Sequence, residues 1–312
     1  MAGMRAASDA SLGPAFPETP RWWTRNQKRL APYVFISPFY ILFFAFFLGP
    51  SIFAFYLAFQ EWTGLGAPEF VGLRNFLDLV EDRTFRQAVV NSAFYSAASL
   101  FVITPLSLLL AVALNSRFVR AKIVFRTVFF LPILTSTIAI ALVFVLLYGT
   151  RYGLLNAPLV ALDIQPIDWL GSKVWSKIAV TGLILWRWVG FNMIYFLAGL
   201  QAIPQHLYEA AKVDGANHWQ SLRFITLPML RPVILFVTVI VLIGSAQIFD
   251  EPYILTEGEP AESSTSLAMY LYRVGLHFLS FGYASAIGTV FFIAIFAFSW
   301  MQLRVLGVFR DD

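Results

Sequence analysis

The sequence predicts an all-α, polytopic membrane protein with about six transmembrane helices. Its composition is the first reason: charged residues make up 13% of the 312 residues, against roughly 25% in an ordinary globular domain. Apolar residues reach 59% and include 32 Phe. A soluble domain of this size could not bury so much apolar surface, and a disordered chain would carry far more polar residues.

Six long apolar stretches are the second reason. About 20 apolar residues are needed to cross roughly 30 Å of hydrocarbon. The stretches run near Tyr33–Ala58, Ser92–Leu114, Val128–Tyr148, Ile178–Ala202, Val233–Phe249 and Ala284–Leu306. The first is too long for a cleaved signal peptide, and a tail (residues 1–32) precedes it.

Residue usage also excludes several kinds of site. The chain has no Cys and only 3 His, so the sequence predicts no disulfide, no thiol nucleophile and no metal site. We expect no catalytic residue. The net charge of +4 indicates the basic cytoplasmic loops of a membrane protein and no nucleic-acid partner.

The distribution of Lys and Arg predicts the orientation. Lys and Arg are twice as numerous on one side of the six predicted spans as on the other. The richer side carries Arg5, Arg21, Arg25, Lys28, Arg29, Arg117, Arg120, Lys122, Arg126, Lys212, Arg223, Arg231, Arg304 and Arg310. Cytoplasmic loops are enriched in these residues, so we expect both termini and the loop at 203–231 to be cytoplasmic.

That loop has the strongest local pattern. Pro204 ends the fourth span and suits an early helical position. One helical face then carries Leu207, Ala210, Ala211 and Asp214. Gly215 suits a helix end that needs positive φ, and Pro228 and Pro232 are expected to begin the fifth span. Periodicity alone leaves open a simple surface helix that caps the bundle.

The loop resembles the cytoplasmic signature of binding-protein-dependent ABC importer permeases. The matching residues keep the family spacing and are Glu209, Ala210, Ala211, Gly215, Ile225, Leu227 and Pro228. Further segments are similar to the sugar permeases of the maltose and glycerol-phosphate type: 70–76, Phe125–Thr127 with Pro132, 152–156 and 281–284. One departure is Thr256-Glu257-Gly258-Glu259-Pro260, where the family often has Thr-Gly-Gly-Gly-Pro.

The resemblance implies a division of labour among several chains. A second homologous permease would complete the pathway, two ATPase subunits or domains would bind ATP and Mg, and an extracytoplasmic solute-binding protein would deliver the sugar. The sequence contains no Gly-x-x-x-x-Gly-Lys-[Ser/Thr], so no phosphate-binding loop of that type is present. We therefore expect no cofactor in this chain.

The resemblance also implies roles along the chain, in the inner or plasma membrane of a prokaryote. Residues 1–32 and 307–312 would be cytoplasmic tails, 33–60 the first transmembrane helix, and 88–306 a permease core of five transmembrane helices. The coupling loop at 203–231 would contact the ATPase through a cytoplasmic coupling helix carrying Glu209, Ala210, Ala211, Asp214 and Gly215.

Polar residues within or beside the spans are candidates for the sugar pathway, because such groups usually face the bundle or a cavity. The candidates are Asn91, Tyr95, Arg187, Asn192, Tyr195, Gln247, Asp250 and Tyr253. Hydrogen bonds between helices, or interfacial anchoring for the tyrosines, are the alternative explanation. Burying Arg187 costs roughly 2.5–3.5 kcal/mol, so we expect it to pair with Asp250 or Glu251, or to line water.

Two other functions are weighed against the importer. A secondary transporter, the main alternative, usually carries carboxylates deep within its spans, whereas here only Asp250 and Glu251 lie at the edge of one. An intramembrane serine protease would place a His near a Ser within the membrane, whereas His206, His218 and His277 fall in loops.

Overall fold

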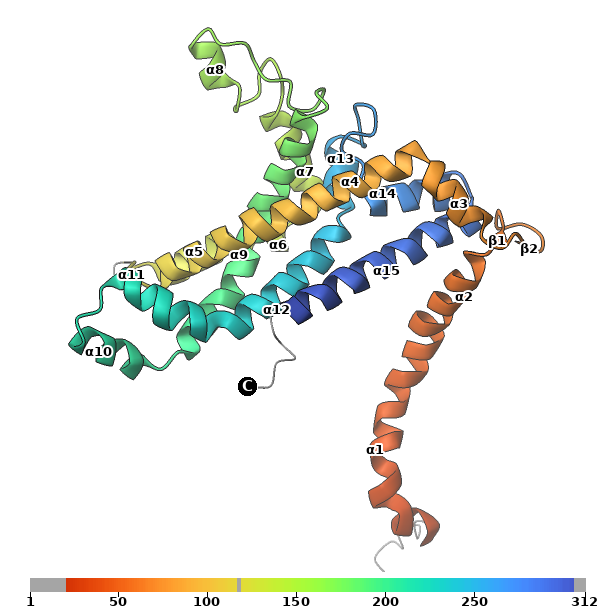
Figure 1. The fold of residues 1–312 in the computed structure, drawn as a ribbon, viewed down its shortest axis with the longest axis horizontal. Coiled ribbons are helices and arrows are strands. Elements are labelled where there is room, and N and C mark those ends of the chain that lie inside the picture. Colours follow the sequence, from red (N-terminus) through yellow and green to blue (C-terminus); the bar gives the residue numbers. More distant parts are fainter. Residues whose placement is uncertain (1–20, 117–118, 306–312) are drawn as a thin grey trace, which may run out of the picture. The chain divides into compact units, whose positions relative to one another are not determined.

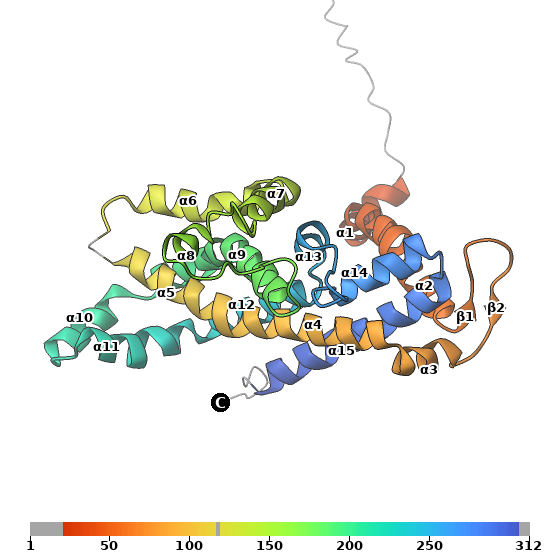
Figure 2. The ribbon, with the colours of Figure 1, turned by 90° about the horizontal axis from the view of Figure 1, so that it is seen from above.

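The computed structural model describes residues 21–116 and 119–305, which are almost entirely helical (Figures 1 and 2). The predicted tail segments 1–20 and 307–312, and Arg117, lie outside these residues. The chain divides into two units, Met1–Phe53 and Ala54–Asp312. The prediction of an all-α polytopic membrane protein is confirmed.

The first unit contains a long helix that begins before the predicted span. Helix α1 (Arg21–Phe43) is followed by the π-helical turn η1 (Phe44–Leu48) and by α2 (Gly49–Leu57). Residues 21–32 were expected to belong to the tail, but they form the start of α1. Hydropathy marks only the apolar part of such a helix, and its polar first turns escape the count.

The second unit contains four further helices long and apolar enough to cross a membrane. They are Arg83–Asn115 (α4 Arg83–Ala98, η2 Ser99–Ile103, α5 Thr104–Asn115), α9 (Trp175–Ala202), His218–Ala246 (α11 His218–Ser221, η3 Leu222–Thr226, α12 Leu227–Ala246) and α15 (Phe281–Val305). Each overlaps a predicted span and begins before it, but the helix predicted to run to Phe249 ends at Ala246.

The third predicted span is not one straight helix. It forms α6 (Lys122–Leu134) and α7 (Thr137–Leu147), which are bent by 99° relative to each other. Thr135 and Ser136 between them adopt extended backbone angles, and Pro132 in the last turn of α6 cannot donate a backbone hydrogen bond. By length and composition the described residues therefore hold five spans, or six if this pair is one broken span.

The fifth span also begins earlier than predicted. Asn217 and Gln220 form a reciprocal capping box at the start of α11, and the helix continues from there to Ala246. Pro228 and Pro232 lie inside this continuous segment and do not begin it. The π-helical turn η3 directly before Pro228 changes the hydrogen-bond register locally, which is one way a transmembrane helix tolerates proline.

Short elements connect the long helices. Strands β1 (Gln60–Glu61) and β2 (Glu69–Phe70) pair antiparallel, with Gln60 opposite Phe70. The short helices are α3 (Arg74–Glu81), α8 (Ala157–Ala161), α10 (Gln205–Val213), α13 (Asp250–Leu255) and α14 (Leu267–Tyr272), which continues into the π-helical turn η4 (Arg273–His277).

Helix α9 is the centre of the second unit. Helices α5, α6, α12 and α13 all pack against it. A Cβ atom at Gly190 would lie 1.7 Å from the Phe129 carbonyl oxygen, so only glycine permits the close approach of α6. The Ser107 hydroxyl donates to the Val189 carbonyl at 2.9 Å and links α5 to the same part of α9.

Candidate functional site

Helix α10 is held to the helix bundle by one face. Pro204 takes the N-cap position with extended backbone, and the helix begins at Gln205. Leu207 and Tyr208 pack against the apolar cluster formed by α5, α9 and α12. The Tyr208 hydroxyl also lies 2.9 Å from the Thr226 hydroxyl of η3, so the helix is fixed at both its apolar and its polar contacts.

Apart from the half-buried Leu207, Tyr208 and Ala211, the rest of α10 is exposed. Glu209, Ala210, Asp214 and Gly215 are exposed, while Ala211 is half-buried. Gly215 has the predicted positive φ, +79°, and a Cβ there would meet nothing within 4 Å. The Ala216 N–H donates to the Ala211 carbonyl at 2.9 Å, closing the helix end. The sequence thus builds a short, rigid, exposed helix with a defined end.

Figures 1 and 2 both place α10 at one end of the second unit. Helices α13 and α14 and the loop between them lie toward the other end. Helix α9 (Trp175–Ala202) runs from the region of α13 and α14 to α10 (Figure 1). Any event at α10 is therefore separated from the α13–α14 loop by the length of a membrane-crossing helix.

Arg187 on α9 forms an ion pair with Glu251 on α13. Its Nη1 atom lies 3.1 Å from Glu251 Oε1, and the two side chains are 14% and 4% exposed. The Trp188 indole N–H donates to the same carboxylate oxygen at 3.3 Å, and the Arg187 guanidinium lies 5.5 Å from the centre of that indole ring. The expected carboxylate partner of Arg187 is confirmed, and it is Glu251.

A cavity of about 140 Å³ is lined in part by Trp188, the residue that bonds Glu251, whereas Arg187 and Glu251 themselves do not line it. Its lining combines apolar side chains with the polar residues Ser99, Asn192 and Ser245, and it includes Trp188. Asn192 is 3% exposed and makes no side-chain hydrogen bond within the described part of the chain. Trp188 therefore contacts Glu251 and also lines the cavity, and Asn192 gives the cavity a polar group able to bond hydroxyls.

The other pathway candidates are not gathered at this cavity. Tyr195 packs edge-on against Phe191 and Phe236, with ring centroids 5.3 and 5.6 Å away. Gln247 and Asp250 are exposed. Tyr253 stacks on Phe249 at 5.0 Å, within an aromatic cluster completed by Tyr272 and His277.

Asn91 and Tyr95 hold a loop. Both are fully buried. The Asn91 amide donates to the backbone carbonyls of Glu262 and Thr265, each at 2.9 Å, and the Tyr95 hydroxyl donates to the Ser264 carbonyl at 2.9 Å. These hydrogen bonds satisfy their polar groups, so the polar pattern on α4 reflects docking of the α13–α14 loop instead of a pathway lining.

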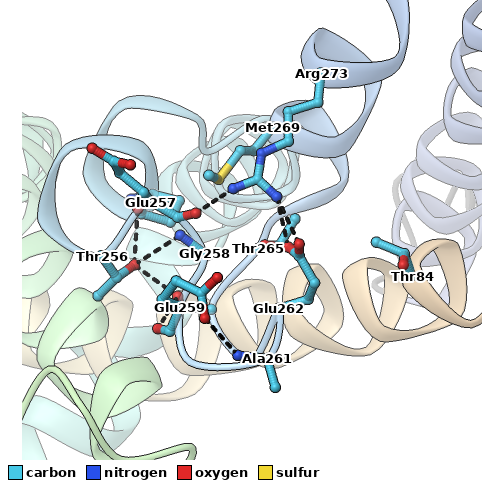
Figure 3. A network of polar contacts seen from close by, with 12 residues as sticks. Thr84, Thr256, Glu257, Gly258, Glu259, Ala261, Glu262, Thr265, Met269 and Arg273 are labelled. Atoms are coloured by element: carbon cyan, nitrogen blue, oxygen red, sulfur yellow. Dashed lines mark hydrogen bonds and ion pairs between the residues drawn. The ribbon is translucent and has the colours of Figure 1, made fainter. Parts of the chain in front are cut away.

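The α13–α14 loop is also closed by Arg273 (Figure 3). Its Nη1 atom donates to both carboxylate oxygens of Glu262 at 2.9 and 2.7 Å, and Nη2 donates to the Glu257 carbonyl. Glu257 and Gly258 have positive φ, 50° and 88°. The departure from the glycine-rich family pattern is therefore accommodated, because Glu257 adopts the left-handed backbone that glycine would take.

Asp82 joins three helices near this loop. Its Oδ1 atom accepts from the backbone N–H groups of Thr84 and Phe85 at 2.8 and 3.1 Å, capping α4. Its Oδ2 atom accepts from the Tyr270 hydroxyl and, at 2.8 Å, from the Tyr283 hydroxyl. Burial acts to raise the pKa of the Asp82 carboxyl, but these hydrogen bonds outweigh it and hold the pKa below its usual value.

Sequence reasoning missed several residues at the α9–α13 site. Trp188 follows Arg187 directly, but an indole N–H beside a carboxylate has no signature in the pattern. Ser99 and Ser245 come from distant helices, and nothing in their local sequence distinguishes them from other serines in spans. Among the described residues, no group of three or more His, Asp or Glu could hold a metal ion.

Comparison with known proteins shows which family this chain resembles. A family model described as "Binding-protein-dependent transport system inner membrane component" matches residues 103–306. The chain is 39% identical over 287 residues to the arabinooligosaccharides transport system permease protein AraP of Bacillus subtilis (strain 168), covering 91% of each chain. It is 37% identical to the lactose transport system permease protein LacF of Rhizobium radiobacter, covering 86% of this chain and 92% of that protein.

A solved structure agrees with the sequence relatives. The crystal structure of a bacterial alginate ABC transporter in complex with an alginate pentasaccharide-bound periplasmic protein contains a chain that matches with a TM-score of 0.80 and 25% identity. The match covers 91% of this chain and 96% of that one. With its apolar membrane-crossing helices, this multi-pass protein belongs to the family of binding-protein-dependent transport system inner membrane components.

Proposed function

We propose that this chain is the permease subunit of an ATP-driven importer that carries a sugar or sugar-like solute. A second homologous permease completes the pathway, two ATPase subunits or domains supply ATP hydrolysis with Mg, and an extracytoplasmic binding protein delivers the solute. Family membership and the sugar-transport names of the relatives support this assignment.

The exposed helix α10 is the single observation that carries the mechanism. It is anchored through Leu207 and Tyr208 and leaves Glu209, Ala210, Asp214 and Gly215 free for a second protein. Small side chains allow close approach, and the closed helix end keeps the element rigid. Such a helix needs shape and stiffness, and no chemistry of its own, to transmit movement from an ATPase.

Transport follows from coupling two states of the assembly. ATP brings the two ATPases together, each seated α10 moves with its ATPase, and the permease halves rock between inward-facing and outward-facing arrangements. This is a two-state element whose equilibrium is biased by a ligand. The Arg187–Glu251 pair and the Asn192 cavity, at a distance from α10 along α9, are the part of this chain that meets the sugar.

Orientation is part of the same proposal. The side rich in Lys and Arg, which includes the α10 loop, is cytoplasmic. The α13–α14 loop, toward the other end of the second unit (Figure 1), is then external and faces the binding protein. Both termini are cytoplasmic in this arrangement.

The substitution Gly215→Val tests the role of α10. A β-branched residue at φ +79° is strained by about 1–3 kcal/mol, enough to tilt the helix end but too little to prevent membrane insertion. We expect the variant to pair with the second permease, while ATPase copurification and sugar uptake both fall. Glu209→Lys should act similarly by reversing a charge at the contact.

Two substitutions serve as matched controls. Gly66 has φ +74° and equally open surroundings, so Gly66→Val introduces the same strain between β1 and β2. Glu81 is an exposed carboxylate at the end of α3, so Glu81→Lys makes the same charge change. Both should retain the ATPase. Normal copurification and uptake in Gly215→Val and Glu209→Lys would reduce α10 to a surface cap and refute the proposal.

A further inference from the structure

We propose that Glu251 determines specificity by cancelling the charge of Arg187, so that the pathway accepts uncharged saccharides and disfavours acidic ones. This inference rests on the proposed function, because it assigns a substrate class to the same site. It goes further than that function because it names the Glu251 carboxylate as the group that decides between uncharged and acidic saccharides.

Within its stretch of α9, the charge of Arg187 is balanced by Glu251 alone among the residues that the structure describes. Between Lys177 and Glu209, Arg187 is the only Lys, Arg, Asp or Glu in the sequence. Its ion pair with Glu251 is short, 3.1 Å, and both side chains are largely shielded from solvent. Shielding strengthens the mutual attraction of the two charges and weakens screening by salt. A solute at the pair therefore meets a neutral unit, and a carboxylated sugar gains no net attraction from the guanidinium.

The pair nevertheless keeps hydrogen-bonding capacity. Only Nη1 of Arg187 contacts Glu251, and the buried Nε atom has no partner within the described residues. On the carboxylate, Oε1 accepts from both Arg187 and Trp188, while Oε2 has no hydrogen bond there. The buried Nε is out of reach of a solute, but Nη2 of Arg187 and Oε2 of Glu251 make no hydrogen bond within the described residues. A donor beside an acceptor suits sugar hydroxyls, which both donate and accept.

Neighbouring groups fit the same class of solute. The cavity that Trp188 lines also offers Ser99, Asn192 and Ser245, all uncharged polar side chains. The Trp188 ring and the ring of Phe191 supply apolar faces at the same cavity, against which the C–H faces of a sugar can pack. Asp250, beside Glu251 in the first turn of α13, is exposed and negatively charged, so it repels an acidic solute.

The test uses uptake by the complete importer in proteoliposomes, with its binding protein. The transported probe is whichever of arabino-oligosaccharides, lactose or maltose the wild type accumulates. Galactose, galacturonate and galactosamine are added as competitors, since they differ in charge on one sugar framework. Every variant is measured with the same binding protein, so a change in the competitor ratio reports on the permease.

Glu251→Gln leaves Arg187 uncompensated. We expect galacturonate to inhibit this variant about tenfold more strongly than galactose, the gain from one charge-assisted hydrogen bond, whereas the two competitors inhibit the wild type alike. Asp250→Asn removes the same charge one residue away and should leave the ratio of the two competitors unchanged. The double variant Arg187→Gln/Glu251→Gln should restore the wild-type ratio.

Arg187→Gln provides an independent arm if Glu251→Gln does not assemble. It leaves Glu251 uncompensated, so galactosamine should become the stronger competitor by a similar factor. Equal inhibition by all three competitors in whichever single variants assemble, or a wild type that already favours galacturonate, would overturn the inference. If the wild type accumulates no saccharide at all, the proposed function itself fails, which is a different result.

Discussion

Asp82 shows how one side chain can fix several helices. It caps α4 and accepts hydrogen bonds from Tyr270 and Tyr283 on α14 and α15. Its carboxylate thus links α4 to two helices that come much later in the sequence. Burial, and then the nearby Asp82 carboxylate, raises the pKa of Tyr270 above its usual value, so this tyrosine remains a hydrogen-bond donor throughout the working range of pH.

We predict that Asp82→Ala lowers the stability of the folded chain by about 2–4 kcal/mol at neutral pH, because a helix cap and the acceptor of two tyrosine hydroxyls are lost. The pKa of Asp82 is depressed in the folded protein. Its contribution is therefore present above the unfolded value of about 3.9 and is lost as pH falls through the folded pKa.

Thermal unfolding in detergent at several pH values measures this effect. The difference between wild type and Asp82→Ala should be largest near neutrality and should shrink only under strongly acidic conditions. Asp78→Ala removes an exposed carboxylate of α3 and serves as the control with little effect. A difference that persists unchanged below the folded pKa would contradict the electrostatic explanation.

At the residue scale, the sequence predicted the ion pair of Arg187 better than it predicted which polar residues line a solute pathway. Arg187 could be assigned a carboxylate partner, because an unpaired charge within a span is costly, and Glu251 was one of two choices within reach. Asn91 and Tyr95 looked equally suited to a pathway, but their partners are backbone carbonyls of residues 262–265. No sequence pattern reveals a hydrogen bond to a distant backbone.

At the scale of elements, the loop helices allow the proposed orientation in the membrane to be tested. The chain contains no Cys, so single cysteines can report each side without background. We predict that Glu257→Cys, in the α13–α14 loop, reacts with an impermeant maleimide on intact cells. Gln205→Cys, at the start of α10, should react only after the cells are permeabilised, and its labelling in intact cells would contradict the orientation.

The sequence predicted which segments are helical, but it did not predict where a helix bends or breaks. The end of α10 at Gly215 could be predicted, because a single residue type favours positive φ. The bend between α6 and α7 was missed, because a hydropathy count treats 128–148 as one apolar stretch. Pro132 and the extended pair Thr135 and Ser136 mark the break, but prolines at 228 and 232 sit within a continuous helix. Proline alone therefore does not decide the outcome.

At the scale of the whole molecule, composition predicted the membrane class. The apolar stretches predicted about six spans, and the described residues hold five, or six if α6 and α7 are one broken span. What the chain does required the family signature on α10, since a bundle of apolar helices serves many kinds of transporter. An importer powered by ATP and a secondary transporter powered by an ion gradient are both bundles of apolar helices, so composition and span count do not separate them. They differ in their energy source.

The energy source is therefore the most direct test. The permease, its partner permease and its ATPases are reconstituted in proteoliposomes, and uptake of a labelled neutral oligosaccharide is measured with the binding protein present. Our account predicts uptake that requires ATP and the binding protein, persists when proton and sodium gradients are collapsed, and falls sharply in Gly215→Val. Uptake driven by an ion gradient in the absence of ATP, and unaffected by Gly215→Val, would contradict it.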